Sequence, residues 1–234
     1  RATPSHLPPR RDDGRGREVH VAIHVTTLPQ SNVADFIFEN AVKRPRHVAV
    51  RRRIDGAWVD VTDTQFVAEV TAVAKGLIAA GIEMGDRIAV MSKTRYEWTL
   101  VDYAGFTVGA VVVPIYETSS AEQVDWILSD SAAKAALVES DEHVAIIESV
   151  RANAPDLRSV WQFETGAIDT LVDAGKDILD DEVTTRREAV NLDDLASILY
   201  TPRPTRPPKG CQLHHRSLTN ETATRLQLPL AAPH

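Results

Sequence analysis

A phosphate-binding loop is predicted at residues 200–211, which read Tyr-Thr-Pro-Arg-Pro-Thr-Arg-Pro-Pro-Lys-Gly-Cys. The segment follows the apolar run 195–199, contains Lys209-Gly210 and is followed by a predicted polar helix start. In α/β proteins, a strand that leads into such a loop presents backbone N–H groups and one ammonium to nucleotide phosphates. Glycines and small hydroxyl residues normally fill these loops because the backbone must approach the phosphates closely. Prolines and arginines take most of these places here, so the sequence predicts a phosphate loop that has been altered.

Composition excludes several other classes of protein. The chain has 234 residues, of which 43% are hydrophobic and 25% charged, as expected for a globular protein. Its formal net charge of −7 disfavours nucleic acid or an anionic membrane as the main partner. Cys211 is the single cysteine, and no apolar stretch approaches the roughly 20 residues of a transmembrane segment. Without a signal-peptide pattern at its start, the chain is expected to be cytoplasmic.

The first residues carry no chemistry that we can assign. Residues 1–18 are rich in proline, glycine and charge, which predicts a disordered tail. His20 and His24 alternate with valine and isoleucine, so both fall on the wet face of an extended segment. No third ligand accompanies them, and we expect no metal site.

Alternating helices and strands set the fold class. A helix is predicted up to Pro45, then a β-hairpin turning at Asp55-Gly56, then a helix that a Thr62–Gln65 capping box begins and Gly81 ends. Buried strands are predicted at 86–91, 111–114, 134–138 and 159–163; the intervening helices are predicted to begin with Thr94–Glu97 and Ser119–Glu122 caps and at Asp141. Residues 164–194 are acidic, with short helices predicted near 168–172 and from Asp180. This rhythm predicts an α/β fold with a doubly wound, mostly parallel sheet, flanking helices and a small N-terminal β-hairpin.

Three segments resemble the adenylate-forming (AMP-binding) enzymes, and among them the bacterial long-chain fatty-acid–CoA ligases. They are 76–89, the run 95–103 with 113–131, and 195–218, where the family has the loop Tyr-Thr-Ser-Gly-Thr-Thr-Gly-x-Pro-Lys-Gly. The resemblance implies a partial N-terminal domain of the adenylate-forming fold at 19–218, with an off-pattern C-terminal tail at 219–234. It also implies ATP, Mg²⁺ and coenzyme A as cofactors, and a long-chain fatty acid as substrate.

The resemblance assigns the residues of the ATP phosphate loop one by one. Thr201, Thr205, Lys209 and Gly210 match the family loop and are the implied cofactor-binding residues; no catalytic or metal-binding residue is assigned. Pro208 matches the loop proline, and His215 matches the histidine after the loop, with His214 in place of a threonine. His215 has two interpretations, a site residue or a plain helix-start residue.

Four positions depart from the family loop: Pro202 replaces serine, Arg203 and Arg206 replace glycines, and Pro204 replaces threonine. The two prolines remove N–H donors, and arginine lacks the access of glycine to positive φ. Family motifs for adenine, ribose, the acyl chain and the C-terminal lysine find no match in this chain. The sequence therefore suggests a truncated or frame-disturbed product.

Three interpretations of function follow from these observations. The first is a fragment of a long-chain fatty-acid–CoA ligase that forms no acyl-adenylate as this chain. The alternative is a non-catalytic binding or interaction module on the same scaffold, for which exposed sheet edges would favour self-association or aggregation. A third possibility is that Lys209 and the loop arginines bind another phosphate ligand.

Overall fold

The computed structural model describes residues 11–12, 18–19, 32–201 and 208–220. The chain divides into two units, residues 1–29 with 220–234 and residues 30–219. In the first unit, β1 (Arg11–Asp12) and β2 (Glu18–Val19) pair antiparallel. His20, His24, Thr205 and most of both predicted tails lie outside the described residues.

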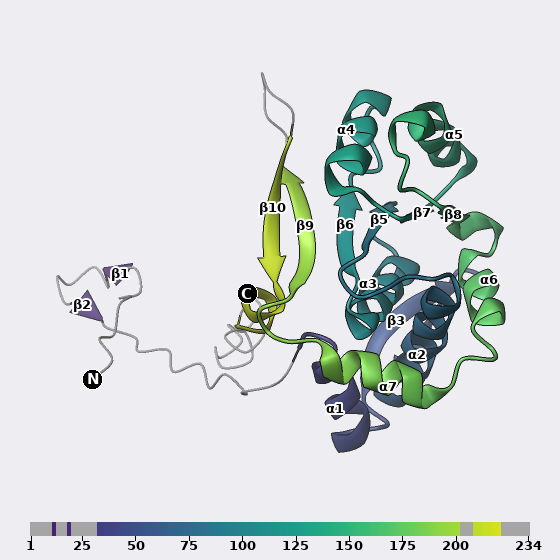
Figure 1. Cartoon of the computed structure of the whole chain (residues 1–234). Helices are drawn as coiled ribbons and strands as arrows, with labels where there is room; N and C mark the ends of the chain where they lie inside the picture. The colour runs from purple at the N-terminus through teal and green to yellow at the C-terminus, as the bar shows by residue number, and fades with distance from the viewer. Residues whose placement is uncertain (1–10, 13–17, 20–31, 202–207, 221–234) are drawn as a thin grey trace. The chain divides into compact units, whose positions relative to one another are not determined.

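The second unit contains the helices and strands predicted from the pattern, with small shifts at their ends (Figure 1). In chain order, its described elements are α1 (Asp35–Lys43), β3 (Val48–Ile54), β4 (Ala57–Thr62), α2 (Asp63–Ala79), β5 (Arg87–Met91), α3 (Tyr96–Val108), β6 (Val111–Ile115), α4 (Ala121–Ser131), β7 (Ala135–Val138), α5 (Asp141–Val150), η1 (Arg151–Asn153), β8 (Ser159–Gln162), η2 (Phe163–Thr165), α6 (Ala167–Ala174), α7 (Asp180–Ala189), β9 (Leu195–Thr201) and β10 (Lys209–His214). Residues 215–220 are helical. No helix in the described ranges is long and apolar enough to cross a membrane.

The central sheet has six strands in the order β10-β9-β6-β5-β7-β8. The pairs from β9 to β8 are parallel, and helices α3, α4 and α5 connect β5, β6, β7 and β8 in turn. From β5 the chain first crosses to β6 on one side and then returns to β7 on the other side. This reversal makes the sheet doubly wound, which confirms the predicted fold class.

Strand β10 was not predicted. Residues 209–214 pair antiparallel with β9, and the expected helix then begins at His215. The predicted phosphate loop therefore joins two antiparallel strands at one edge of the sheet (Figure 1).

For two of the three helices with a predicted N-cap, the structure has a different N-cap residue. The Thr62–Gln65 capping box at α2 is confirmed, with both reciprocal bonds present. At α4 the box is formed by Ser120 and Gln123, one residue later than predicted. At α3 the N-cap is Arg95, whose side chain makes no capping bond; Glu97 instead accepts two bonds from its guanidinium.

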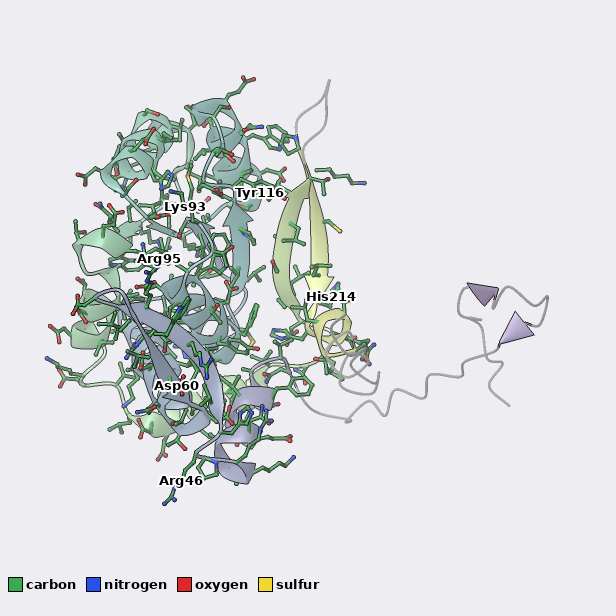
Figure 2. All side chains as sticks on the ribbon, turned by 180° about the vertical axis from the view of Figure 1, so that it is seen from behind. Arg46, Asp60, Lys93, Arg95, Tyr116 and His214 are labelled. Carbon is green, nitrogen blue, oxygen red and sulfur yellow. The ribbon has the colours of Figure 1, made fainter. Side chains whose placement is uncertain are left out.

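The small hairpin β3–β4 turns at Asp55 and Gly56, as predicted. Both residues have positive φ, 49° and 82°, as a two-residue hairpin turn requires. Across the strands, Arg51 Nε donates to Asp60 Oδ1 at 2.7 Å, and Asp60 is labelled on this hairpin in Figure 2.

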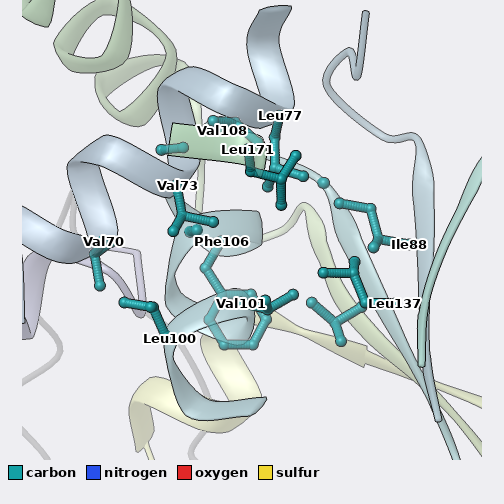
Figure 3. Close-up of a cluster of buried hydrophobic side chains, with 14 of the residues drawn as sticks. Val70, Val73, Leu77, Ile88, Leu100, Val101, Phe106, Val108, Leu137 and Leu171 are labelled. Atoms are coloured by element: carbon teal, nitrogen blue, oxygen red, sulfur yellow. The ribbon is translucent and has the colours of Figure 1, made fainter. Parts of the chain in front are cut away.

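Hydrophobic side chains fill both faces of the central sheet. On one face, α2, α3 and α6 pack over β5 and β7, with Val73, Leu77, Val101 and Leu171 fully or almost fully buried (Figure 3). On the other face, α4 and α5 contribute a second core cluster. Strands covered on both faces explain the near-continuous apolar runs in the sequence.

Candidate functional site

The two ends of the predicted phosphate loop lie side by side on β9 and β10. Thr201 pairs with Lys209 in the antiparallel register, and both side chains are exposed. Directly opposite residues of an antiparallel pair project to the same face. The hydroxyl of Thr201 and the ammonium of Lys209 therefore share one open face of the hairpin.

Tyr200 occupies the opposite face of the hairpin. Its ring is buried in the core cluster under α4, and its hydroxyl donates to Asp130 Oδ2 at 2.6 Å. Burial, with the bond to Asp130, raises the pKa of the Tyr200 hydroxyl well above its usual range, so the group stays protonated and remains a donor.

Gly210 lies opposite Tyr200 and has a clear packing role. A β-carbon at this position would come 2.9 Å from Ile198 Cγ2 and 3.2 Å from Tyr200 Cζ. The glycine thus leaves room for the buried tyrosine ring. Its backbone adjoins Lys209, but its position belongs to the face turned away from Thr201 and Lys209.

The loop returns to β10 through Pro208, whose carbonyl oxygen accepts a hydrogen bond from Trp126 Nε1 at 2.9 Å. Trp126 lies on α4, one turn before Asp130. Of the four predicted loop residues, the structure places Thr201, Lys209 and Gly210 around this hairpin, and Thr205 lies outside the described residues.

His215 is a packed residue away from the open face of the hairpin. It is fully buried, its Nδ1 accepts a bond from the Val33 N–H at 3.3 Å, and its ring meets Phe106 edge-on at 5.7 Å. Burial lowers its pKa to about 4, so the ring is neutral at physiological pH. These contacts favour the helix-start interpretation. His214, by contrast, is exposed, with its Nδ1 2.6 Å from the Asp193 carbonyl oxygen.

A cleft of about 850 Å³ lies at the carboxyl ends of β5 and β7, and sequence reasoning missed it. Open α/β sheets bind ligands at this end, where the direction of winding reverses. The lining residues include Arg52, Trp58, Lys93, Arg95, Glu139 and Phe163. Figure 2 shows Lys93 and Arg95 here, and the phosphate-loop residues are not among the lining.

Ion pairs inside this cleft balance most of its charge. Arg95 donates twice to Glu97, at 2.7 and 3.1 Å, and the backbone N–H of Lys93 donates to Glu139 at 2.8 Å. Glu69 accepts from both Arg52 and the Tyr96 hydroxyl, at 2.9 and 2.8 Å. The cleft is therefore polar and mixed in charge.

Within the described ranges, no group of three or more His, Cys, Asp or Glu residues could hold a metal ion.

Comparisons with known proteins agree with this geometry. A family model described as "AMP-binding enzyme" matches residues 37–231. The long-chain-fatty-acid–CoA ligase FadD15 of Mycobacterium bovis is 42% identical over 208 residues, covering 88% of this chain and 35% of that protein. The FadD15 protein of Mycobacterium tuberculosis is 41% identical over 208 residues, which also cover 88% of this chain and 35% of that protein. This chain therefore spans about a third of the length of the curated relatives it matches.

Solved structures give the same fold. The fatty acyl CoA synthetase of Mycobacterium tuberculosis superposes with a TM-score of 0.64 at 26% identity, covering 79% of this chain and 34% of that one. VinN in complex with 3-methylaspartate has a TM-score of 0.66 at 19% identity, over 83% of this chain and 50% of that one, which supports the fold alone.

Proposed function

Because this chain belongs to the AMP-binding enzyme family, we propose that it is the amino-terminal part of a long-chain fatty-acid–CoA ligase. The observation that supports the proposal is the β9–β10 hairpin, in which Thr201 and Lys209, which match the threonine and lysine of the family loop in sequence, are paired and exposed. Enzymes of this family use ATP and coenzyme A, and Mg²⁺ accompanies the nucleotide. The proposed substrate is a long-chain fatty acid.

The described ends of the loop fit a phosphate group. Lys209 would supply a positive charge and Thr201 a hydroxyl donor. The buried side chain of Tyr200 would keep β9 and β10 in register. When bound, ATP supplies the α-phosphate that the fatty-acid carboxylate attacks, pyrophosphate leaves, and coenzyme A then displaces AMP. In a family enzyme with an intact loop, residues at the positions of Thr201 and Lys209 would hold the departing phosphates.

The residues between the two ends fit poorly, and we propose that this chain forms no acyl-adenylate. Pro202 and Pro204 carry no N–H, and Arg203 and Arg206 stand where the family has glycines. Losing one preorganised donor commonly costs about 10²- to 10³-fold in rate, and several are lost here.

Fatty-acid-dependent exchange of labelled pyrophosphate into ATP tests this part of the proposal. The purified chain, with MgATP and a long-chain fatty acid, should show no exchange above the fatty-acid-free background. Exchange that requires fatty acid and disappears in Lys209→Ala would show that the chain is an active ligase and overturn the inactive assignment.

The cleft favours a second function, a non-catalytic binding or interaction module. It lies apart from the phosphate-loop residues, and its lining includes Ile54 and Trp58 of the β3–β4 hairpin, which are 43% and 69% exposed. Exposed apolar side chains of this kind favour association. Sedimentation over a wide concentration range tests the self-associating form of this module; a monomer at every concentration would count against it.

A further inference from the structure

We propose that helix α4 is the positioning element of the phosphate loop, and that it holds both ends of the loop through Asp130 and Trp126. This role rests on the proposed function of the loop. It concerns two side chains that the family loop motif does not include and that lie 70 and 82 residues from their partners in the sequence.

Asp130 holds the strand that leads into the loop. The Tyr200 hydroxyl donates to its carboxylate at 2.6 Å, and the Tyr200 ring is buried beneath α4. A hydrogen bond to a charged acceptor is stronger than one between neutral groups. The last buried residue before the loop is therefore fixed both by packing and by a short bond.

Trp126 holds the segment that leaves the loop. Its indole N–H donates to the carbonyl oxygen of Pro208, the residue before Lys209. Positions 126 and 130 are four residues apart, so both side chains project from the same face of α4. One helical face thus contacts the chain immediately before and immediately after the loop.

The helix is itself fixed to the parallel sheet. The Ser120–Gln123 capping box holds its beginning. At its end, the guanidinium of Arg87, the first residue of β5, donates to the carbonyl oxygens of Ser131 and Ala132 at 2.6 and 3.1 Å. These bonds connect the loop ends, through α4, to the centre of the sheet.

The parallel sheet pairs with β9 before the loop end of the strand. Among the described residues, the parallel pairing of β9 with β6 is recorded at Val112 with Ser197, three residues before Tyr200. Beyond that pair, Tyr200 and Thr201 pair with Gly210 and Lys209 of β10, and α4 contacts Tyr200 and Pro208. Removing the contacts from α4 should loosen the hairpin near the loop without disturbing the rest of the sheet.

Hydrogen exchange of the nucleotide-free chain tests this role. Trp126→Phe removes the indole N–H but keeps an aromatic ring, and Tyr200→Phe removes only the hydroxyl. Because Asp130 is exposed, its carboxylate remains solvated in the second variant. The matched control is Trp58→Phe, at an exposed position on β4. The reference segment is β5, at 87–91.

Relative to the wild type, the backbone amides of 209–214 should exchange about three- to tenfold faster in Trp126→Phe and about tenfold or more faster in Tyr200→Phe. The exchange rates of β5 in both variants, and all rates in the control variant, should stay unchanged. Unchanged rates at 209–214, or an equal acceleration in β5, would overturn the positioning role. Adding MgATP separates the two proposals. If MgATP slows exchange at 209–214 neither in the wild type nor in a chain whose loop is restored by Pro202→Ser, Arg203→Gly, Pro204→Thr and Arg206→Gly, the proposed function fails, while the nucleotide-free rates still decide the role of α4.

Discussion

Gly210 and Tyr200 lie directly opposite each other in the β9–β10 hairpin, and a β-carbon at 210 would come within 3.2 Å of Tyr200 Cζ. The glycine that the family loop motif places after its lysine therefore has a packing reason in this chain. It allows a tyrosine ring to fill the space beneath α4, while Thr201 and Lys209 face the other way.

Replacing Gly210 with alanine should destabilise the chain by about 1–3 kcal/mol, because the added methyl group would be forced against Ile198 and Tyr200. Urea unfolding measures the difference. Cys211→Ala is the matched control, since this neighbouring side chain is exposed. Equal stability of the Gly210 and Cys211 variants would contradict the packing role.

Asp102 should make the stability of the chain fall as pH rises. Burial raises the pKa of its carboxyl to about 7, against a smaller opposing effect of the Trp98 hydrogen bond. Between about pH 4 and 7, Asp102 keeps its proton in the folded state and has lost it in the unfolded state. The contribution of Asp102 to the free energy of unfolding is therefore complete below about pH 4 and is lost as the pH rises towards 7.

The measurement is the free energy of unfolding of wild type and Asp102→Asn between pH 4 and 8. Relative to the variant, the wild type should lose up to about 1.4 kcal/mol per pH unit inside that window and then level off. Parallel stability curves for the two proteins would show that Asp102 titrates normally in the folded state.

His215 should produce the opposite slope. Burial lowers its pKa to about 4, so below pH 6.5 the unfolded state binds a proton that the folded state does not. The contribution of His215 to the free energy of unfolding is complete above pH 6.5 and is lost as the pH falls towards 4. Relative to His215→Gln, wild type should lose up to about 1.4 kcal/mol per unit of falling pH. A constant difference between the two across this range would contradict the burial of a neutral ring.

Gly76 on α2 should tolerate no side chain. A β-carbon there would overlap the backbone of Leu171 on α6, while a β-carbon at Gly175 would come 2.5 Å from the Gly76 nitrogen. Gly76→Ala should cost about 3 kcal/mol or more in thermal unfolding, because backbone must move. Gly105→Ala is the control, since its β-carbon would meet one valine methyl group at 3.1 Å. Equal effects of the two changes would argue against the close approach of α2 and α6.

The parallel sheet was predictable because its central strands β5, β6 and β7 are short apolar runs buried on both faces. Strand β10 was not, since Lys209–His214 shows no clear alternation and is a strand only through pairing with β9. The cap of α4 was ambiguous because Ser119 and Ser120 each have a suitable partner three residues on. Ser119 closes a turn by donating its N–H to the Tyr116 carbonyl oxygen, which leaves Ser120 as the cap.

The sequence predicts which residues form the loop, but it does not predict the contacts that hold the ends of the loop. The bonds from Asp130 to Tyr200 and from Trp126 to Pro208 cross 70 and 82 residues, and no local pattern links such partners. The cleft was equally hidden, because its walls come from distant parts of the chain: β3, β4, α2, α3, the residues after β5 and β7, and the η2–α6 segment. Both features depend on the folded topology.

Binding of MgATP, measured by titration calorimetry, tests most directly the claim that this chain keeps the framework of a phosphate loop but lacks its donors. The wild type should bind at least about tenfold more weakly than a variant with Pro202→Ser, Arg203→Gly, Pro204→Thr and Arg206→Gly, and adding Lys209→Ala to that variant should remove the gain. Wild-type binding as tight as that of the restored loop, or restored binding that does not need Lys209, would contradict it.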